Sequence, residues 1–318
     1  MSKLFLFLFP LLLISISACE DDEDPLVPTT PTTPTGSAVE RINFPPGSVF
    51  PEGIARTNEG SFYAGSLTTG TLYVASAEAQ SFSAYLPQGE GLSTALGVEI
   101  AGSRMLVAGG ATRQLQVVDL TTNSSRILDA PPVAADSSLL NDASIAGTGE
   151  AYVTDSYAPF IYRVPVRGDT MEVAYDLRQS IIDYQAGFNL NGIVTTLDDR
   201  YLITVQTNTG NLYRIDLQSG EISRINIVGE GTLLAGDGLA LDALTLYVAI
   251  NQSNEVAVVD LTDDYATGTI SRRIEQNFRF PTAIAAQRNS LYVLNAQLNA
   301  LMGQATVQLP FSAVRVDL

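Results

Sequence analysis

The chain has no histidine and no tryptophan, and it has one cysteine, Cys19, among its 318 residues. Without histidine, a Ser-His-Asp triad, a histidine general base and a histidine-ligated zinc site are all excluded. The single cysteine excludes an intrachain disulfide, and the lack of tryptophan argues against repeats of the WD type. Any mechanism that depends on imidazole or on a disulfide within the chain is therefore ruled out.

Positive charge is also scarce, because 17 Lys and Arg residues stand against 34 Asp and Glu residues, which gives a net charge of −17. This excess of negative charge argues against binding to nucleic acid or to an anionic membrane surface, and fits binding of a cation or a neutral ligand. Hydrophobic residues make up 46% of the chain. The length and composition are therefore sufficient for a sizeable core, in one large domain or two ordinary ones.

The first residues are typical of a secretory signal. One lysine precedes an apolar stretch at 4–13, which is too short for a membrane span, and small residues follow it. The sequence "ISAC" at 16–19 resembles a bacterial lipobox, in which a peptidase cuts before the cysteine and the cysteine carries a lipid. We therefore expect a signal peptide at 1–18 and lipidation of Cys19. The protein would then be an outer-membrane lipoprotein, periplasmic or at the cell surface, that contacts the membrane through its lipid alone.

A polar segment separates this cysteine from the rest of the chain. The run "EDDEDP" directly after Cys19 resembles the export signals of bacterial surface lipoproteins, although a solvated charge run is the simpler interpretation. The following "PLVPTTPTTPTGS" has the Pro/Thr-rich composition of an extended tether. We predict a tether at 19–37 and a folded domain at 38–318.

Segments of similar sequence recur along this domain. The first strand of each repeat reads "PEGIA", "LGVEI", "NDASI", "NGIVT", "DGLAL" or "TAIAA", and the first inward positions are Glu52, Leu96, Asn141, Asn191, Asp237 and Thr282. Successive positions are 44, 45, 50, 46 and 45 residues apart. A period of this size is typical of solenoids, propellers and arrays.

Each repeat continues with further short runs that are rich in Val, Ile and Tyr and bounded by turn residues, which indicates antiparallel strands. Four such strands form the blade of a β-propeller, so six repeats predict an all-β, six-bladed propeller of four-stranded blades. The sixth repeat lacks a fourth strand. The segment "AVERINF" at 38–44 resembles the fourth strands "EISRINI" and "ISRRIEQ". We predict that it completes the last blade and closes the ring, which removes an exposed sheet edge.

The first strand of each propeller blade lines the central channel, so the six aligned residues should meet at one face. Glu52, Asn141, Asn191 and Asp237 carry side-chain oxygens, and no Lys or Arg stands at an equivalent position. Burial of two carboxylates is costly unless they are paired or bind a cation. Carboxylates and amide carbonyls are the ligands that Ca²⁺ prefers. The ring therefore predicts a site for Ca²⁺ or another divalent cation, with a merely wet, polar channel as the alternative.

Four short motifs at this spacing carry a family resemblance: "PEG", "ND", "NG" and "DG" at 51–53, 141–142, 191–192 and 237–238. With them, the chain resembles the gluconolactonase/regucalcin (senescence-marker-protein) family of calcium-dependent six-bladed propellers. The resemblance implies that Glu52, Asn191 and Asp237 bind the cation. It also implies that Asn141 borders both metal and substrate.

The same resemblance implies a calcium-dependent hydrolase of a lactone or a related ester, in which Asp237 also accepts a proton. One position departs from the family, because the sugar lactonases carry an arginine two residues before the asparagine of "ND", where this chain has Leu139. We therefore expect a more apolar mouth, with Leu140, Phe188 and Leu190 also near the ligands. Gluconolactone is accordingly not the substrate that we expect.

Several other residues are candidates for supporting roles. Asp142 could assist from behind the ligands, and Asp155, Asn208 and Asn251 each follow a second strand, on the same face as the ring. Residues of these types also commonly form turn hydrogen bonds. Two other functions stay open: a non-enzymatic propeller with a structural calcium that binds an unknown surface ligand, and a strictosidine-synthase-like enzyme. We expect a monomer.

Overall fold

The structure is a computed structural model, and it describes residues 40–318 except 48, 134, 136, 167 and 288. The predicted signal peptide, the lipidation site Cys19 and the tether at 19–37 lie outside the described residues. Among the described residues, no helix has the length and apolar character needed to cross a membrane.

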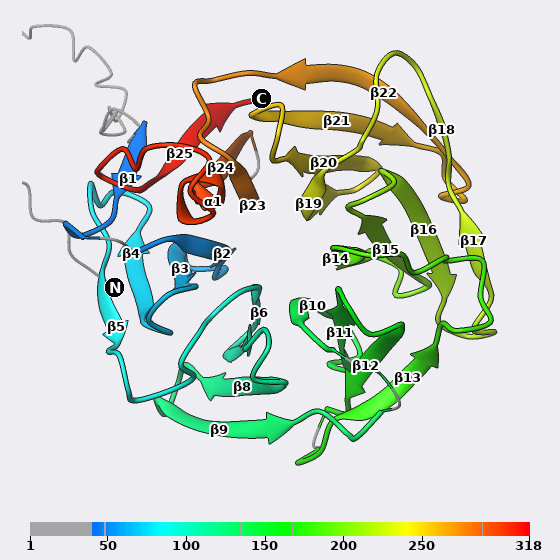
Figure 1. The fold of residues 1–318 in the computed structure, drawn as a ribbon, viewed down its shortest axis with the longest axis horizontal. Coiled ribbons are helices and arrows are strands. Elements are labelled where there is room, and N and C mark those ends of the chain that lie inside the picture. Colours follow the sequence, from blue (N-terminus) through cyan, green and yellow to red (C-terminus); the bar gives the residue numbers. More distant parts are fainter. Residues whose placement is uncertain (1–39, 48, 134, 136, 167, 288) are drawn as a thin grey trace, which may run out of the picture. The chain divides into compact units, whose positions relative to one another are not determined.

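Six sheets follow one another around a central axis, and the innermost strands β2, β6, β10, β14, β19 and β23 surround it (Figure 1). The first three sheets are β2 (Pro51–Arg56), β3 (Ser61–Ser66), β4 (Leu72–Ser76) and β5 (Ser83–Leu86); β6 (Val98–Ala101), β7 (Arg104–Ala108), β8 (Gln114–Asp119) and β9 (Ser124–Asp129); and β10 (Leu140–Ile145), β11 (Ala151–Asp155), β12 (Phe160–Val164) and β13 (Glu172–Asp176).

The fourth sheet contains β14 (Leu190–Thr195), β15 (Tyr201–Gln206), β16 (Asn211–Asp216) and β17 (Ile222–Arg224). The fifth contains β19 (Gly236–Asp242), β20 (Thr245–Ile250), β21 (Glu255–Leu261), β22 (Thr267–Ile274) and β18 (Asn226–Val228). The sixth contains β23 (Pro281–Gln287), β24 (Ser290–Asn295), β25 (Ser312–Asp317) and β1 (Arg41–Asn43), and the short helix α1 (Leu298–Leu301) lies between β24 and β25. The predicted six-bladed, all-β propeller is confirmed.

The second strand of a blade is buried on both faces, because it lies in the middle of a sheet that neighbouring blades cover on both sides. All residues of β11 and β15 are buried, and both strands are mainly apolar, with Thr154, Asp155, Thr204 and Gln206 as their buried polar residues. The outermost strands face solvent instead, and five of the six residues of β9 are exposed. This gradient from the inside to the outside explains why the second strands are the most regular segments of the repeat.

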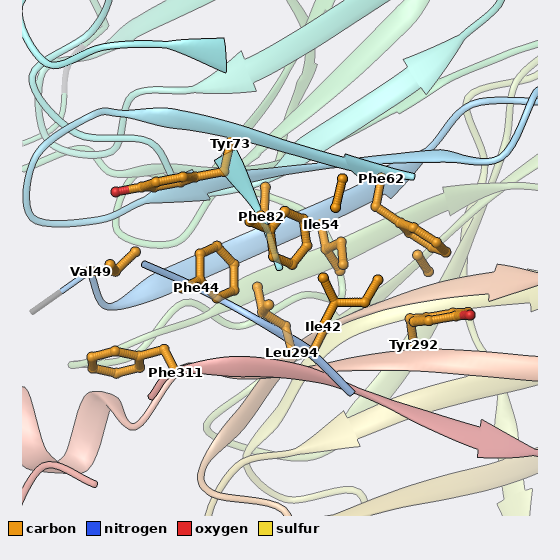
Figure 2. Packing of buried hydrophobic residues seen from close by; sticks show 14 of the residues in the cluster. Ile42, Phe44, Val49, Ile54, Phe62, Tyr73, Phe82, Tyr292, Leu294 and Phe311 are labelled. Carbon is orange, nitrogen blue, oxygen red and sulfur yellow. The ribbon is translucent and has the colours of Figure 1, made fainter. Parts of the chain in front are cut away.

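The N-terminal strand closes the ring, as predicted. Strand β1 pairs antiparallel with β25, with Asn43 opposite Ser312. Ile42 and Phe44 are buried between the last blade and the first (Figure 2), and the rings of Phe44 and Phe82 stack at a centroid distance of 4.3 Å. Because Phe82 directly precedes β5 of the first blade, these contacts join the sixth blade to the first as well as completing the sixth.

The fifth blade has five strands where four are predicted. The predicted fourth strand of the preceding blade, "EISRINI" at 221–227, is interrupted at Ile225, which is fully buried. Its first half, β17, pairs with β16, and its second half, β18, crosses to the next blade and pairs parallel with β22. Burial of Ile225 in the fifth blade's hydrophobic cluster thus links two neighbouring blades at their outer edges.

Candidate metal and substrate site

The inner strands are irregular at the predicted ring. In β2, β10, β14, β19 and β23, the pairing with the second strand shifts register across the ring residue and the residue that follows it. A bulge of this kind sets two residues opposite one and re-aims their side chains. The same local irregularity therefore brings the ring side chains to the channel in five of the six blades.

Glycines after the ring residues allow the inner strands to approach closely. A Cβ atom on Gly53 would lie 2.3 Å from the carbonyl oxygen of Leu96, and one on Gly192 would lie 2.4 Å from that of Asp237. These positions have no space for a side chain, since even a methyl group would overlap the next blade's main chain. The glycines of the family dipeptides thus set the spacing between blades, and the residues before them carry the chemistry.

The four oxygen-bearing ring residues, Glu52, Asn141, Asn191 and Asp237, are all buried, with at most 6% of their surface exposed. Leu96 and Thr282 complete the ring and are also buried. A cavity of about 60 Å³ lies in the channel. It has room for an ion or a few waters. Its walls include Glu52, Asn141 and Asn191, the carboxyl groups of Glu99 and Asp142, and no Lys or Arg.

Neighbouring blades fix the orientation of the two ring asparagines. The Nδ2 of Asn141 donates to Ser156 Oγ at 2.8 Å, and this hydroxyl donates to the main-chain oxygen of Leu190. The Nδ2 of Asn191 donates to Thr207 Oγ1 at 3.2 Å, and that hydroxyl donates to the main-chain oxygen of Gly236. In both cases the amide nitrogen donates to a hydroxyl that in turn donates to the main chain of the next blade. The same kind of contact therefore fixes the two amide nitrogens.

Asp237 is held in a similar way by Asn251. The Nδ2 of Asn251 donates to Asp237 Oδ2 at 2.8 Å and to the main-chain oxygen of Pro281. The other carboxylate oxygen, Asp237 Oδ1, is buried and has no hydrogen-bond partner. A buried acceptor without a partner destabilises the fold, and contact of this oxygen with a cation would remove that cost.

Burial dominates the electrostatics of the channel. It raises the pKa of Glu52 well above its ordinary value, and the nearby carboxylates of Asp237 and Asp142 raise it further. Burial raises the pKa of Asp237 to about 7, against the hydrogen bond from Asn251, which lowers it. Burial likewise raises the pKa of Asp142 to about 7 and that of Glu99 to about 8. These acids suppress one another's ionisation, and a bound cation would relieve the repulsion.

The other predicted supporting residues have different surroundings. Asp142 lines the cavity and accepts hydrogen bonds from the main-chain nitrogens of Ala143 and Ile193. Asp155 is fully buried and accepts from the main chain around it, including the nitrogens of Leu139 and Ala158, so it shapes a loop. Asn251 contacts the ring, because it donates to Asp237. Asn208 does not contact the ring in this way and donates to Asn189 Oδ1 in a loop.

Two expectations about the mouth are wrong. Leu140 and Leu190 are fully buried in the cores of their blades, because each is the last regularly paired residue before the bulge, which turns the residues after it toward the channel. Phe188 is 43% exposed, and Leu139 packs partly against the core. Asn189 is a loop residue whose amide organises residues 185–189 through the main-chain oxygens of Gln185 and Gly187.

Sequence reasoning missed Glu99, the fourth acidic residue of the channel. It stands three residues after Leu96, where the other blades have Ala, Ser or Val. A single charged residue at an otherwise small, uncharged aligned position is the signal that could have identified it. Among the described residues, no three His, Cys, Asp or Glu side chains group closely enough to hold a metal ion. A cation in the ring would therefore need amide oxygens in addition to Glu52 and Asp237.

The fold and the channel define a six-bladed β-propeller with an acidic, amide-rich central site. The model of the SMP-30/gluconolactonase/LRE-like region matches residues 50–297. The chain belongs to this family, as its dipeptides indicate. No curated protein sequence matches it.

Three solved structures illustrate the similarity of fold. Regucalcin from Agrobacterium tumefaciens, described as a calcium-binding protein, is 16% identical over 88% of this chain and 95% of its own, with a TM-score of 0.63. A gluconolactonase from Xanthomonas campestris is 14% identical over 85% and 87%, with a TM-score of 0.60. Virginiamycin B lyase from Staphylococcus aureus is 14% identical over 80% and 80%, with a TM-score of 0.57. At these identities the likeness concerns the fold.

Proposed function

We propose that the protein is a divalent-cation-dependent hydrolase that opens a lactone or cleaves a related ester. The observation that carries the proposal is the state of Asp237, whose Oδ2 is held by Asn251 while its buried Oδ1 has no partner. Membership of the gluconolactonase-like family supports the reaction class. The acidic composition and the absence of basic residues from the cavity wall support binding of a cation.

The residues present fit a hard divalent cation such as Ca²⁺, which prefers carboxylate and carbonyl oxygens. Glu52, Asn191 and Asp237 would hold it, each from a different blade. When bound, the cation supplies Lewis-acid chemistry, since it polarises a carbonyl and lowers the pKa of water. The amide oxygen of Asn191 would add a neutral ligand to the two carboxylates, while its Nδ2 is engaged by Thr207.

The chain's own residues would orient the substrate and move the proton. Asn141, fixed through Ser156, is the candidate for contact with the ester group. Asp237 Oδ1 is the candidate acceptor for the proton of the attacking water, since Asn251 occupies the other oxygen. A cation nearby lowers the basicity of this carboxylate, so the drive for proton transfer must come mainly from the acidified water.

Histidine separates this proposal from lyase chemistry on the same fold. Virginiamycin B lyase is described as catalytically inactive when one of its histidines is replaced by alanine. The present chain contains no histidine. A reaction that requires that side chain has no counterpart here, whereas hydrolysis through carboxylates and a cation needs none.

The cellular setting remains a proposal that rests on the sequence. The signal-like segment and the placement of Cys19 support a lipid-anchored protein at the outer membrane. Metabolic labelling with a fatty-acid probe, compared with a Cys19→Ser variant, tests this, and equal labelling of both proteins would contradict it.

Thermal melts in calcium and in chelator test the proposed site, with wild type, Asn191→Ala and the control Asn208→Ala, followed by hydrolysis assays on lactones and esters. We expect calcium to raise the melting temperature of wild type and of Asn208→Ala, and to have little effect on Asn191→Ala. No shift in wild type would refute the metal site. A shift without hydrolysis of any lactone or ester would favour the non-enzymatic binding propeller, with calcium in a structural role.

A further inference from the structure

We infer that the substrate is a lactone or ester that carries an apolar alkyl or aryl group, which lies on blades three to six at the channel mouth. This inference rests on the proposed hydrolase function and adds the chemical class of the substrate. It is argued from the distribution of charge and of exposed apolar side chains around the ring.

The connections between the second and third strands of the blades are nearly uncharged on a strongly acidic protein. The connections from the second to the third strand of each blade open on the face of the ring, at 67–71, 109–113, 156–159, 207–210, 251–254 and 296–311. Arg113 is their single charged residue, and its guanidinium is engaged by the main-chain oxygen of Pro131. These six connections therefore offer a substrate mainly hydroxyl, amide and apolar groups, whereas charged residues such as Glu230 and Arg279 stand in the loops between blades.

Two exposed apolar residues flank Asn191 from both sides. Phe188 stands three residues before Asn191, and Leu234 stands three residues before Asp237, so the two have equivalent places in consecutive blades. They are 43% and 46% exposed. The equivalent residue in the other blades is a buried valine, a serine or an arginine, which makes blades four and five the apolar side of the mouth.

An aromatic contact of Phe188 and a main-chain hydrogen bond beside Leu234 connect these two residues to the partners of the ring asparagines. The Phe188 ring lies 5.2 Å from that of Tyr157, the residue after Ser156, whose hydroxyl receives the Asn141 amide. The residue after Leu234, Ala235, donates its main-chain N–H to Thr207, which receives the Asn191 amide. Phe188 and Leu234 are therefore connected, through Tyr157 and Ala235, to the segments that hold the two ring asparagines, and we place the apolar group of a bound ester against them.

The connection at 296–311 extends the apolar side into the sixth blade. It contains no charged residue, and Leu301, Met302 and Leu309 are exposed on it. Gln297 and Gln308 exchange hydrogen bonds between the side chain of the first and the main chain of the second, and so fix the neck of this loop. Leu139, which stands where the sugar lactonases carry an arginine, is partly buried against the core and adds no charge on blade three.

A matched pair of substrates tests the inference: a γ-lactone with a linear alkyl chain and a sugar-derived γ-lactone with hydroxyl groups, both assayed with saturating calcium. We expect wild type to have the higher kcat/KM on the alkyl lactone. A double variant, Phe188→Ser with Leu234→Ser, should lower that value roughly tenfold, mainly through KM. Leu197→Ser is the control, because Leu197 is 76% exposed at the opposite end of blade four.

The outcomes separate this inference from the function on which it rests. Preference for the sugar-derived lactone, or an undiminished preference for the alkyl lactone in the double variant, would overturn the apolar subsite and leave the hydrolase proposal standing. If neither lactone is hydrolysed, the hydrolase proposal fails, and calorimetric binding of an alkyl lactam decides the subsite. Binding that the double variant loses would support it, whereas no binding or unchanged binding would overturn it.

Discussion

The stability of the metal-free protein should fall as pH rises from about 5 to about 8, because of Asp237. Burial raises its pKa from 3.8 to about 7. Between these values the folded protein keeps a proton that the unfolded chain has lost, so each unit of pH costs the folded state about 1.4 kcal/mol. The contribution of Asp237 amounts to about 4 kcal/mol over the whole interval between its unfolded and folded pKa values, and about 3 kcal/mol of it is lost between about pH 5 and about pH 8.

Urea unfolding followed by circular dichroism, in chelator, measures this free energy at both pH values. Glu52, Asp142 and Glu99 also have raised pKa values and should add to the fall in wild type. The variant Asp237→Asn isolates one group, since asparagine keeps an acceptor for Asn251 and cannot ionise. Its stability should depend less steeply on pH than that of wild type.

Calcium should reverse the dependence, because a cation favours the ionised carboxylates whose mutual repulsion causes the loss. With saturating calcium we expect wild type to be more stable at about pH 8 than in chelator, and the gain to be smaller at about pH 5. Equal stability of metal-free wild type at both pH values, or identical slopes for wild type and Asp237→Asn, would refute the reasoning about the buried charge.

Three further substitutions test how the site and the ring are held together. Asn251→Ala should destabilise the fold by about 1–3 kcal/mol in urea unfolding, since it leaves Asp237 Oδ2 and the Pro281 carbonyl without their donor. A loss of free energy of unfolding below about 0.3 kcal/mol would show that the amide is dispensable. Gly192→Ala should cost about 1–3 kcal/mol by the same assay, because its Cβ would lie 2.4 Å from the Asp237 carbonyl oxygen, and a neutral result would mean that the blades can separate freely. Ile42→Ala, in the closing strand, should lower stability by about 2–4 kcal/mol, as for a fully buried isoleucine; the half-buried neighbour Arg41→Ala is the control, and equal effects would contradict a packing role for Ile42.

The repeat made the fold predictable, because the position of Glu52 recurs at nearly constant spacing and four strands fit between recurrences. The closing strand was predictable for a related reason, since the segment around Ile42 repeats the pattern of the other outer strands. The crossing of the chain at Ile225 was not predictable from pattern alone. Which blade a short outer strand pairs with depends on contacts between blades, and these leave no period in the local sequence.

The site was predictable to the extent that it follows the repeat. The alignment found Glu52, Asn141, Asn191 and Asp237; the first three line one cavity, and Asp237 lies near enough to Glu52 to raise its pKa. It failed for Leu140 and Leu190, since strict alternation of inward and outward side chains breaks down at a bulge. The partners that hold the ring, such as Ser156 and Thr207, lie on other strands and become visible only in three dimensions.

Closure by β1 has a consequence for the order of events during biosynthesis. Strand β1 cannot pair until β25 has been synthesised, because Asn43 pairs with Ser312, which lies almost a full chain length later in the sequence. Until then, the first blade to emerge from the ribosome lacks the aromatic packing that Phe44 and Phe82 share with the last blade. Pairing of residues so far apart in sequence is slow, whereas the entropic cost of closing the loop grows only slightly with each added residue. The ring should therefore mature in a single late step, and nascent chains that stall before that strand should be preferred targets for proteases and chaperones.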